Sequence, residues 1–229
     1  MSRFLFARPL PLTLITLMLL LLWDASGLDL VLAQSMGTPL GFPWRHQWFL
    51  NTVMHEGAKT LSWVVTIALF IAIWWPVGFL RRLGRRDRVQ LAISALASVA
   101  VISLTKRASS TSCPWDLQAF GGVARYVSHW AWGVRDGGGG NCFPAGHASA
   151  AFCYLGGYFA WRRTSAVIAR RWLLCSAIAG LALGLSQQWR GAHFMSHTLW
   201  TAWLCWVTGY VVDVAMQWLA ARRSVAYTV

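Results

Sequence analysis

The sequence has few acidic side chains and few charges of either sign. Asp and Glu together number 7 in 229 residues, and all charged residues make up only 12% of the chain. A soluble globular domain usually carries about 25% charged residues, whereas 57% of this chain is hydrophobic. The scarcity of charge excludes an ordinary soluble domain and predicts an all-α, polytopic membrane protein.

The few charges that are present are mostly basic, and the formal net charge is +13. A nucleic-acid-binding surface would spread such residues along an amphipathic or aromatic-interleaved face. Here the arginines stand in short clusters between apolar stretches. They are typical of membrane topology signals, and no nucleic-acid partner is expected.

Apolar segments long enough to cross a bilayer, which takes roughly 20 residues each, recur along the chain. Six spans are predicted, at residues 10–32, 61–80, 89–105, 147–161, 172–189 and 197–220. No soluble domain remains between them, so residues 1–229 are expected to form a single membrane domain. The residues VLAQ (31–34) loosely resemble a cleavage site, so a cleaved signal peptide is an alternative for the first segment.

Arginine clusters predict the orientation, because short cytoplasmic loops carry the excess of Lys and Arg. With six spans, the clusters fall on one side together with both termini, which are therefore expected to be cytoplasmic. The clusters lie at Arg3 and Arg8, at residues 81–88 and 161–171, and at Arg222 and Arg223. Residues 24–60, 106–146 and 190–196 then form the extracytoplasmic loops.

The first outer loop contains an aromatic-rich segment, residues 43–58, which is predicted to be an interfacial helix. His46, His55 and Glu56 lie in it, but their spacing is not that of a zinc site with a close ligand pair. No metal site is predicted, and these residues are interpreted as surface residues of the interfacial helix. The same interpretation applies to His129 in the long outer loop.

Polar groups from three separate segments reach the outer face. Lys106 ends the third span, PAGH (144–147) opens the fourth, and SQQWRGAHFMSH (186–197) joins the fifth to the sixth. Because the fourth and fifth spans run antiparallel, His147 and His193 are expected at the same depth. Two histidines and a lysine are therefore predicted to meet.

This pattern resembles the type 2 phosphatidic acid phosphatase superfamily, integral membrane lipid phosphatases whose signature is K-x6-R-P, P-S-G-H and S-R-x5-H-x3-D. The corresponding parts here are KRASSTSCP (106–114), PAGH and SQQWRGAHFMSH, with every separation kept. Four positions differ from the signature, where arginine, serine, arginine and aspartate are replaced by Cys113, Ala145, Gln187 and His197.

The resemblance implies dephosphorylation of a lipid phosphate or pyrophosphate without metal or cofactor. It assigns His193 as the nucleophile that forms a phosphohistidine, and His147 as the acid that protonates the leaving oxygen and then activates water. His197 is expected to orient His193. The expected phosphate contacts are Lys106, Arg107, Ala145, Gly146, Ser186, Gln187 and Arg190.

Two of these assignments have alternatives. Arg190 precedes His193 by three residues, so one helical turn would place its guanidinium beside the nucleophile, but it is equally an arginine that extends to lipid headgroups. Asp116 is a candidate carboxylate near His197 or simply a turn residue after Pro114.

Cysteine positions predict a disulfide. Cys113 and Cys142 lie outside the spans, beside two motifs, in a compartment expected to be oxidising. A bond between them would stabilise the chain by about 3 kcal/mol. Cys153, Cys175 and Cys205 lie in apolar segments and are interpreted as packing residues, and Asp213 in the sixth span is assigned to helix packing.

The resemblance further implies a bacterial inner membrane enzyme with its site on the outer face. The substrates that it suggests are undecaprenyl pyrophosphate, phosphatidic acid, phosphatidylglycerophosphate and lipid A phosphates, among which the sequence does not choose. Two other functions stay open, a lipid phosphotransferase that uses the same phosphohistidine and a catalytically inactive membrane-binding protein.

Overall fold

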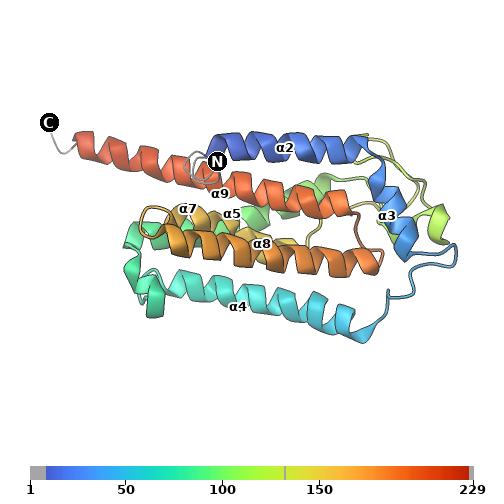
Figure 1. Cartoon of the computed structure of the whole chain (residues 1–229), viewed down its shortest axis with the longest axis horizontal. Helices are drawn as coiled ribbons and strands as arrows, with labels where there is room; N and C mark the ends of the chain where they lie inside the picture. The colour runs from blue at the N-terminus through green and yellow to red at the C-terminus, as the bar shows by residue number, and fades with distance from the viewer. Residues whose placement is uncertain (1–8, 132, 227–229) are drawn as a thin grey trace.

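A computed structural model describes residues 9–131 and 133–226, and within these ranges the chain is helical, with isolated bridges but no β-strand. The predicted topology residues Arg3 and Arg8 lie outside the described ranges. The long helices lie side by side along one axis, with the connecting loops at the two ends (Figure 1).

Six longer helices and several short ones make up the described part of the bundle. The first two, α2 and α3, follow each other closely at the N-terminal side, and α9 closes the chain. In chain order the longer elements are α2 (Pro9–Ala25), α3 (Leu28–Met36), α4 (Ala58–Ile71), α5 (Arg85–Ala108), α8 (Ala166–Trp189) and α9 (Met195–Ala226). The shorter ones are η1 (Phe49–Gly57), η2 (Gly78–Arg82), η3 (Pro114–Asp116), η4 (Gln118–Phe120), α6 (Ser149–Phe152), η5 (Cys153–Gly156) and α7 (Gly157–Trp161).

Fewer helices than the six predicted spans are long and apolar enough to cross a membrane alone. Three described helices qualify, namely α5, α8 and residues 195–222 of α9, while α2 and α3 qualify only as a pair bent by 67°. Gly27 lies at the bend with a φ of 70°, a left-handed conformation that glycine adopts without strain. The predicted first span is therefore interrupted.

The second predicted span, residues 61–80, is displaced along the chain. The helix begins earlier, because the nine-residue π-helix η1 continues directly into α4, and it ends at Ile71. Turn residues then lead to Pro76, which has no N–H group to continue a helix. The predicted interfacial segment 43–58 is thus largely the start of this helix rather than a separate one.

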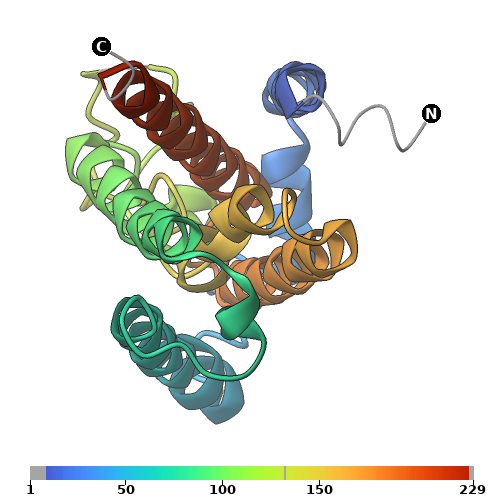
Figure 2. The same cartoon turned by 90° about the vertical axis from the view of Figure 1, so that its left-hand side faces the viewer.

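The fourth predicted span is the centre of the bundle. Residues 149–161 form α6, η5 and α7, and Phe152, Phe159 and Trp161 are each no more than 1% exposed. Figure 2 shows this segment among α5, α8 and α9, with α2 and α4 at the periphery. It is a buried core helix interrupted by a 3-10 turn, which explains why it does not qualify as a span by itself.

The directions of the helices place the motif residues and the arginine clusters at opposite ends of the bundle. The helix α5 begins at Arg85 and has Lys106 in its last turn, while α8 and α9 are antiparallel and meet at residues 190–194. All three motifs therefore lie at one end of the bundle, and the arginine clusters among the described residues, 81–88, 161–171 and Arg222, lie at the other. This arrangement matches the grouping that the positive-inside rule predicts.

Candidate active site

Backbone hydrogen bonds fasten the second motif to the third. The Ala145 N–H donates to the His197 carbonyl at 3.2 Å, and the Thr201 hydroxyl donates to the Ala145 carbonyl at 3.1 Å. Ala145 is fully buried, and its two hydrogen bonds hold the PAGH turn against α9. These bonds therefore fix the position of His147 relative to His193.

Three histidine rings gather at this end of the bundle. The ring centroids of His147 and His193 are 6.4 Å apart, and Nδ1 of His193 lies 3.4 Å from Nδ1 of His197. His193 is 3% exposed and His197 is 1% exposed. The two predicted catalytic histidines are thus brought together, with His197 directly behind His193.

A cavity of about 300 Å³ opens beside His147. Lys106, Gly146 and His147 line it, as predicted for a phosphate site, and Ser149 and Lys59 line it as well. Lys59 belongs to α4 and was not predicted to be a site residue. It adds a second cation to the cavity that holds Lys106.

His55 is the second residue that the sequence interpretation missed. Its ring centroid lies 3.6 Å from that of His147, and its Nδ1 lies 2.7 Å from Oε1 of Glu56. The interpretation of His55 as a surface residue of an interfacial helix is wrong, because the π-helix η1 presses its ring against the motif histidine. π-Helical turns are frequent at functional sites.

Burial keeps the two motif histidines neutral. Desolvation, reinforced by His55, Lys106, Arg190 and Lys59, lowers the pKa of His147 to about 3. Burial also lowers the pKa of His193 well below its usual value, and the nearby Lys106 acts in the same direction. A neutral imidazole is the nucleophilic form, and an arriving phosphate would offset the cations that oppose protonation of His147.

Arg190 is buried and does not extend to lipid headgroups. Its guanidinium donates to Oε1 of Gln187 at 3.0 Å, to the carbonyl of Arg45 at 3.1 Å and to Oδ1 of Asn51 at 2.8 Å. These bonds tie the end of α8 to η1. Its charge lowers the pKa of His147, so it acts on the acid side of the site rather than being held beside His193.

The other predicted phosphate contacts lie apart from the cavity. The Ser186 hydroxyl donates to the Leu183 carbonyl at 2.7 Å inside α8, and Gln187 bonds to Ser186 and Arg190. Arg107 lines a different cavity of about 410 Å³ together with Asp136. The structure does not bring these side chains to His147.

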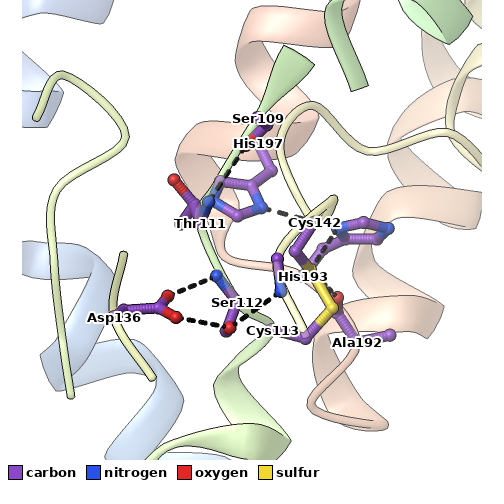
Figure 3. Close-up of a disulfide and its surroundings, with 10 residues drawn as sticks. Ser109, Thr111, Ser112, Cys113, Asp136, Cys142, Ala192, His193 and His197 are labelled. Carbon is purple, nitrogen blue, oxygen red and sulfur yellow. Dashed lines mark hydrogen bonds between the residues drawn. A yellow bond between two sulfur atoms is a disulfide. The ribbon is translucent and has the colours of Figure 1, made fainter. Parts of the chain in front are cut away.

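A disulfide joins Cys113 to Cys142, with their Cα atoms 5.2 Å apart (Figure 3). It connects the first motif to the second. The glycine-rich loop at residues 136–141 is held beside it, since the Asp136 carboxylate accepts the Ser112 N–H at 2.6 Å and the Ser112 hydroxyl at 2.8 Å. The Cys142 sulfur lies 3.5 Å from Nδ1 of His193, so the disulfide is part of the wall of the site.

A carboxylate approaches His197 indirectly, through a residue other than Asp116. Nε2 of His129 lies 3.3 Å from Oδ2 of Asp24, and the His129 ring lies edge to face with that of His197 at 5.9 Å. Asp116 instead holds a turn, where its N–H donates to the Cys113 carbonyl at 2.9 Å. The interpretation of His129 as an uninvolved surface residue is wrong.

Sequence signals for the missed residues exist but are weak. His55 and Lys59 are four residues apart, so a helix through this segment places them on one face. Asp24 interrupts an apolar stretch, and an acidic side chain in such a position needs a partner. Neither signal names the residue that it faces, which only the packing of the bundle decides.

Comparison with known proteins gives a family. No curated protein and no solved structure matches the chain significantly. The PAP2 superfamily matches residues 88–222, which contain all three motifs and more than half of the chain. Such membership indicates phosphatase or phosphotransferase activity on phosphate esters, in a membrane protein of apolar helices. The chain belongs to the PAP2 superfamily, the type 2 phosphatidic acid phosphatases.

Proposed function

We propose that the protein hydrolyses the phosphate of a membrane lipid through a phosphohistidine, without a metal ion. The observation that carries this proposal is the meeting of Lys106, His147 and His193 from three segments, with the two rings 6.4 Å apart. Such a gap suits two imidazoles that act on opposite sides of one phosphorus atom.

In the proposed reaction, Nε2 of His193 attacks phosphorus while the bond to the lipid oxygen breaks. His147, protonated once phosphate is bound, gives its proton to that oxygen. Neutral His147 then removes a proton from water, the hydroxide attacks phosphorus, and inorganic phosphate leaves as His193 is restored. His197, whose Nδ1 faces Nδ1 of His193 at 3.4 Å, orients the nucleophile.

Charge on the phosphoryl oxygens needs cations that are already in place. Lys106 and Lys59 share the cavity, and Arg190 acts on His147 from the end of α8. We assign to Lys59 part of the function of the two motif arginines that Cys113 and Gln187 replace.

A lipid substrate is supported by an apolar groove of about 660 Å³ next to the cavity that Lys106 and His147 line. Leu61, Val65 and Leu183 line the groove, while Ser62 and Ala150 line both the groove and the cavity. The headgroup would enter the cavity and the tails would lie in the groove. The six spans predicted from the sequence would cross the inner membrane, with the site on the outer side and both termini in the cytoplasm.

The test is phosphate release by purified protein in detergent with EDTA present. The panel contains a prenyl pyrophosphate, phosphatidic acid, phosphatidylglycerophosphate and lipid A, and the control variants are His193→Ala and His147→Ala. We expect release from at least one lipid and loss of release in the His193→Ala variant. Release that persists in that variant, or that requires a metal ion, would refute the mechanism, and transfer to a lipid acceptor without free phosphate would indicate a phosphotransferase.

A further inference from the structure

Three potential metal ligands, one of them on the proposed nucleophile, lie close together. They are the sulfur of Cys142 and one ring nitrogen each of His193 and His197, and all lie within 4.8 Å of one another. Cys142 is 0% exposed, His193 is 3% exposed and His197 is 1% exposed. The proposed phosphatase reaction uses the far side of the His193 ring, so it leaves this cluster without a chemical function.

The distances between these atoms fit a tetrahedral zinc ion. Zinc binds thiolate at about 2.3 Å and imidazole at about 2.0–2.1 Å, so tetrahedral edges are about 3.4 Å between two nitrogens and about 3.5 Å between nitrogen and sulfur. The two nitrogens of His193 and His197 are 3.4 Å apart, and the Cys142 sulfur lies 3.5 Å from the His193 nitrogen. Two edges of the tetrahedron are therefore already present, and Figure 3 shows both rings beside the sulfur.

The disulfide prevents metal binding as long as it is intact. Only a thiolate is a strong zinc ligand, and the Cys142 sulfur is bonded to Cys113. We propose that reduction of this disulfide creates a zinc site made of Cys142, His193 and His197, with water at the fourth corner. Zinc would therefore bind at His193 only when the Cys113–Cys142 disulfide is reduced.

The chemistry balances with a dithiol as the reductant. The dithiol gives two electrons and two protons to the Cys113–Cys142 bond and is oxidised to its own disulfide, leaving two thiols in the protein. Zinc then displaces the thiol proton of Cys142 and takes the lone pair of one nitrogen on each neutral histidine. No further reactant is required.

Zinc in this site would inhibit the enzyme. It would occupy Nδ1 of His193 and separate that nitrogen from His197, so the ring would lose both its orientation and its nucleophilic strength. This consequence rests on the proposed function of His193, whereas the binding of zinc does not. The two parts are therefore measured separately.

The binding test compares two cysteine variants of the full-length protein in detergent. Cys113→Ser leaves a permanent thiol at residue 142, whereas Cys142→Ser removes the ligand and leaves a thiol at residue 113. After incubation with zinc chloride and desalting, we expect Cys113→Ser to retain about one zinc per chain without any reductant, and Cys142→Ser to retain almost none. Cobalt in the Cys113→Ser variant should give a thiolate-to-metal charge-transfer band.

Wild-type protein keeps the proposal falsifiable if either variant folds poorly. A phosphine reductant, which takes an oxygen atom from water as it reduces the disulfide, is removed before zinc is added. We expect zinc to bind to the reduced protein but not to the untreated protein, nor to reduced protein whose thiols have been alkylated. Equal zinc in all three samples, or no zinc in the reduced sample, would overturn the proposed site.

Activity is then measured on the same samples. We expect phosphate release from reduced, zinc-loaded protein to fall at least about tenfold and to return when a chelator removes the metal. Bound zinc with unchanged phosphate release would contradict the inhibition and the assignment of His193, but it would leave the metal site intact.

Discussion

Asp213 offers the sharpest test of what holds the arginine end of the bundle together. Its carboxylate is 0% exposed and accepts hydrogen bonds from Arg163 at 2.6 Å, Arg162 and Gln217 at 2.7 Å, and Gln90 at 2.9 Å. These donors come from α5, from the turn that follows α7, and from α9 itself. The assignment of Asp213 to helix packing predicts that its charge stabilises the fold.

The expected magnitude follows from the partners that are left behind. Removing one member of a buried ion pair costs about 3–5 kcal/mol, because the remaining charge has no counterion. Arg162 and Arg163 are only partly buried, with side chains 22% and 38% exposed, and asparagine keeps one acceptor oxygen. We therefore expect Asp213→Asn to lower the free energy of unfolding by about 2–3 kcal/mol.

The matched control is Asp87→Asn, which removes a more exposed carboxylate from the same network. Asp87 accepts from Arg163 at 3.0 Å, and pairs of this kind contribute about 0–1 kcal/mol. Thermal unfolding in detergent should show a Tm about 4–12 °C lower for Asp213→Asn and at most about 4 °C lower for the control. Equal Tm values for the two variants would refute the argument that burial gives this network its strength.

Further outcomes concern the site and the core. Lys59→Met should lower kcat/KM by about ten- to a hundredfold and Lys59→Arg should restore most of it, whereas full activity in Lys59→Met would remove this lysine from the phosphate site. Because the pKa of His147 is about 3 in the folded protein and about 6.5 when unfolded, its stabilising contribution is complete above pH 6.5 and is lost as the pH falls. The Tm of wild-type protein should therefore drop more between pH 7.5 and pH 5 than that of His147→Gln, and parallel curves would contradict the depressed pKa. A Cβ at residue 209 would lie 2.5 Å from the Gly156 Cα, so Gly209→Ala should cost about 1–3 kcal/mol in denaturant unfolding, and an unchanged midpoint would show that these helices separate easily.

Motif residues could be placed from the sequence because their neighbours along the chain fix them. Lys106 lies at the end of one apolar helix, PAGH precedes the next, and residues 186–197 join α8 to α9. The directions of the helices alone therefore bring the three motifs to one end of the bundle. The Cys113–Cys142 bond follows from the same reasoning, since each cysteine lies next to a motif. These features depend only on the order of the segments along the chain and on successive helices running in opposite directions.

Residues that depend on the rotation of a helix about its axis could not be placed. His55 contacts His147 because η1 is a π-helix, which turns its residues differently from an α-helix. The bend at Gly27 and the end of α4 at Ile71 also shorten two segments whose composition alone predicts full spans.

Residues of the N-terminal helices lie at the motif end of the bundle, where four positions differ from the family motifs. The superfamily match begins at residue 88, yet Asp24, Asn51, His55 and Lys59 all precede it and all reach the motif end of the bundle. Asn51 accepts a hydrogen bond from Arg190, and the His55 ring lies against that of the motif residue His147. Lys59 brings a cation to the cavity that Lys106 and His147 line, and Asp24 brings a carboxylate, through His129, toward the imidazole that replaces the motif aspartate. If the proposed function is correct, charges that the motifs lack come from outside the matched region, and a chimaera that exchanged residues 9–84 for those of a relative with complete motifs should lose activity even though every motif residue is kept.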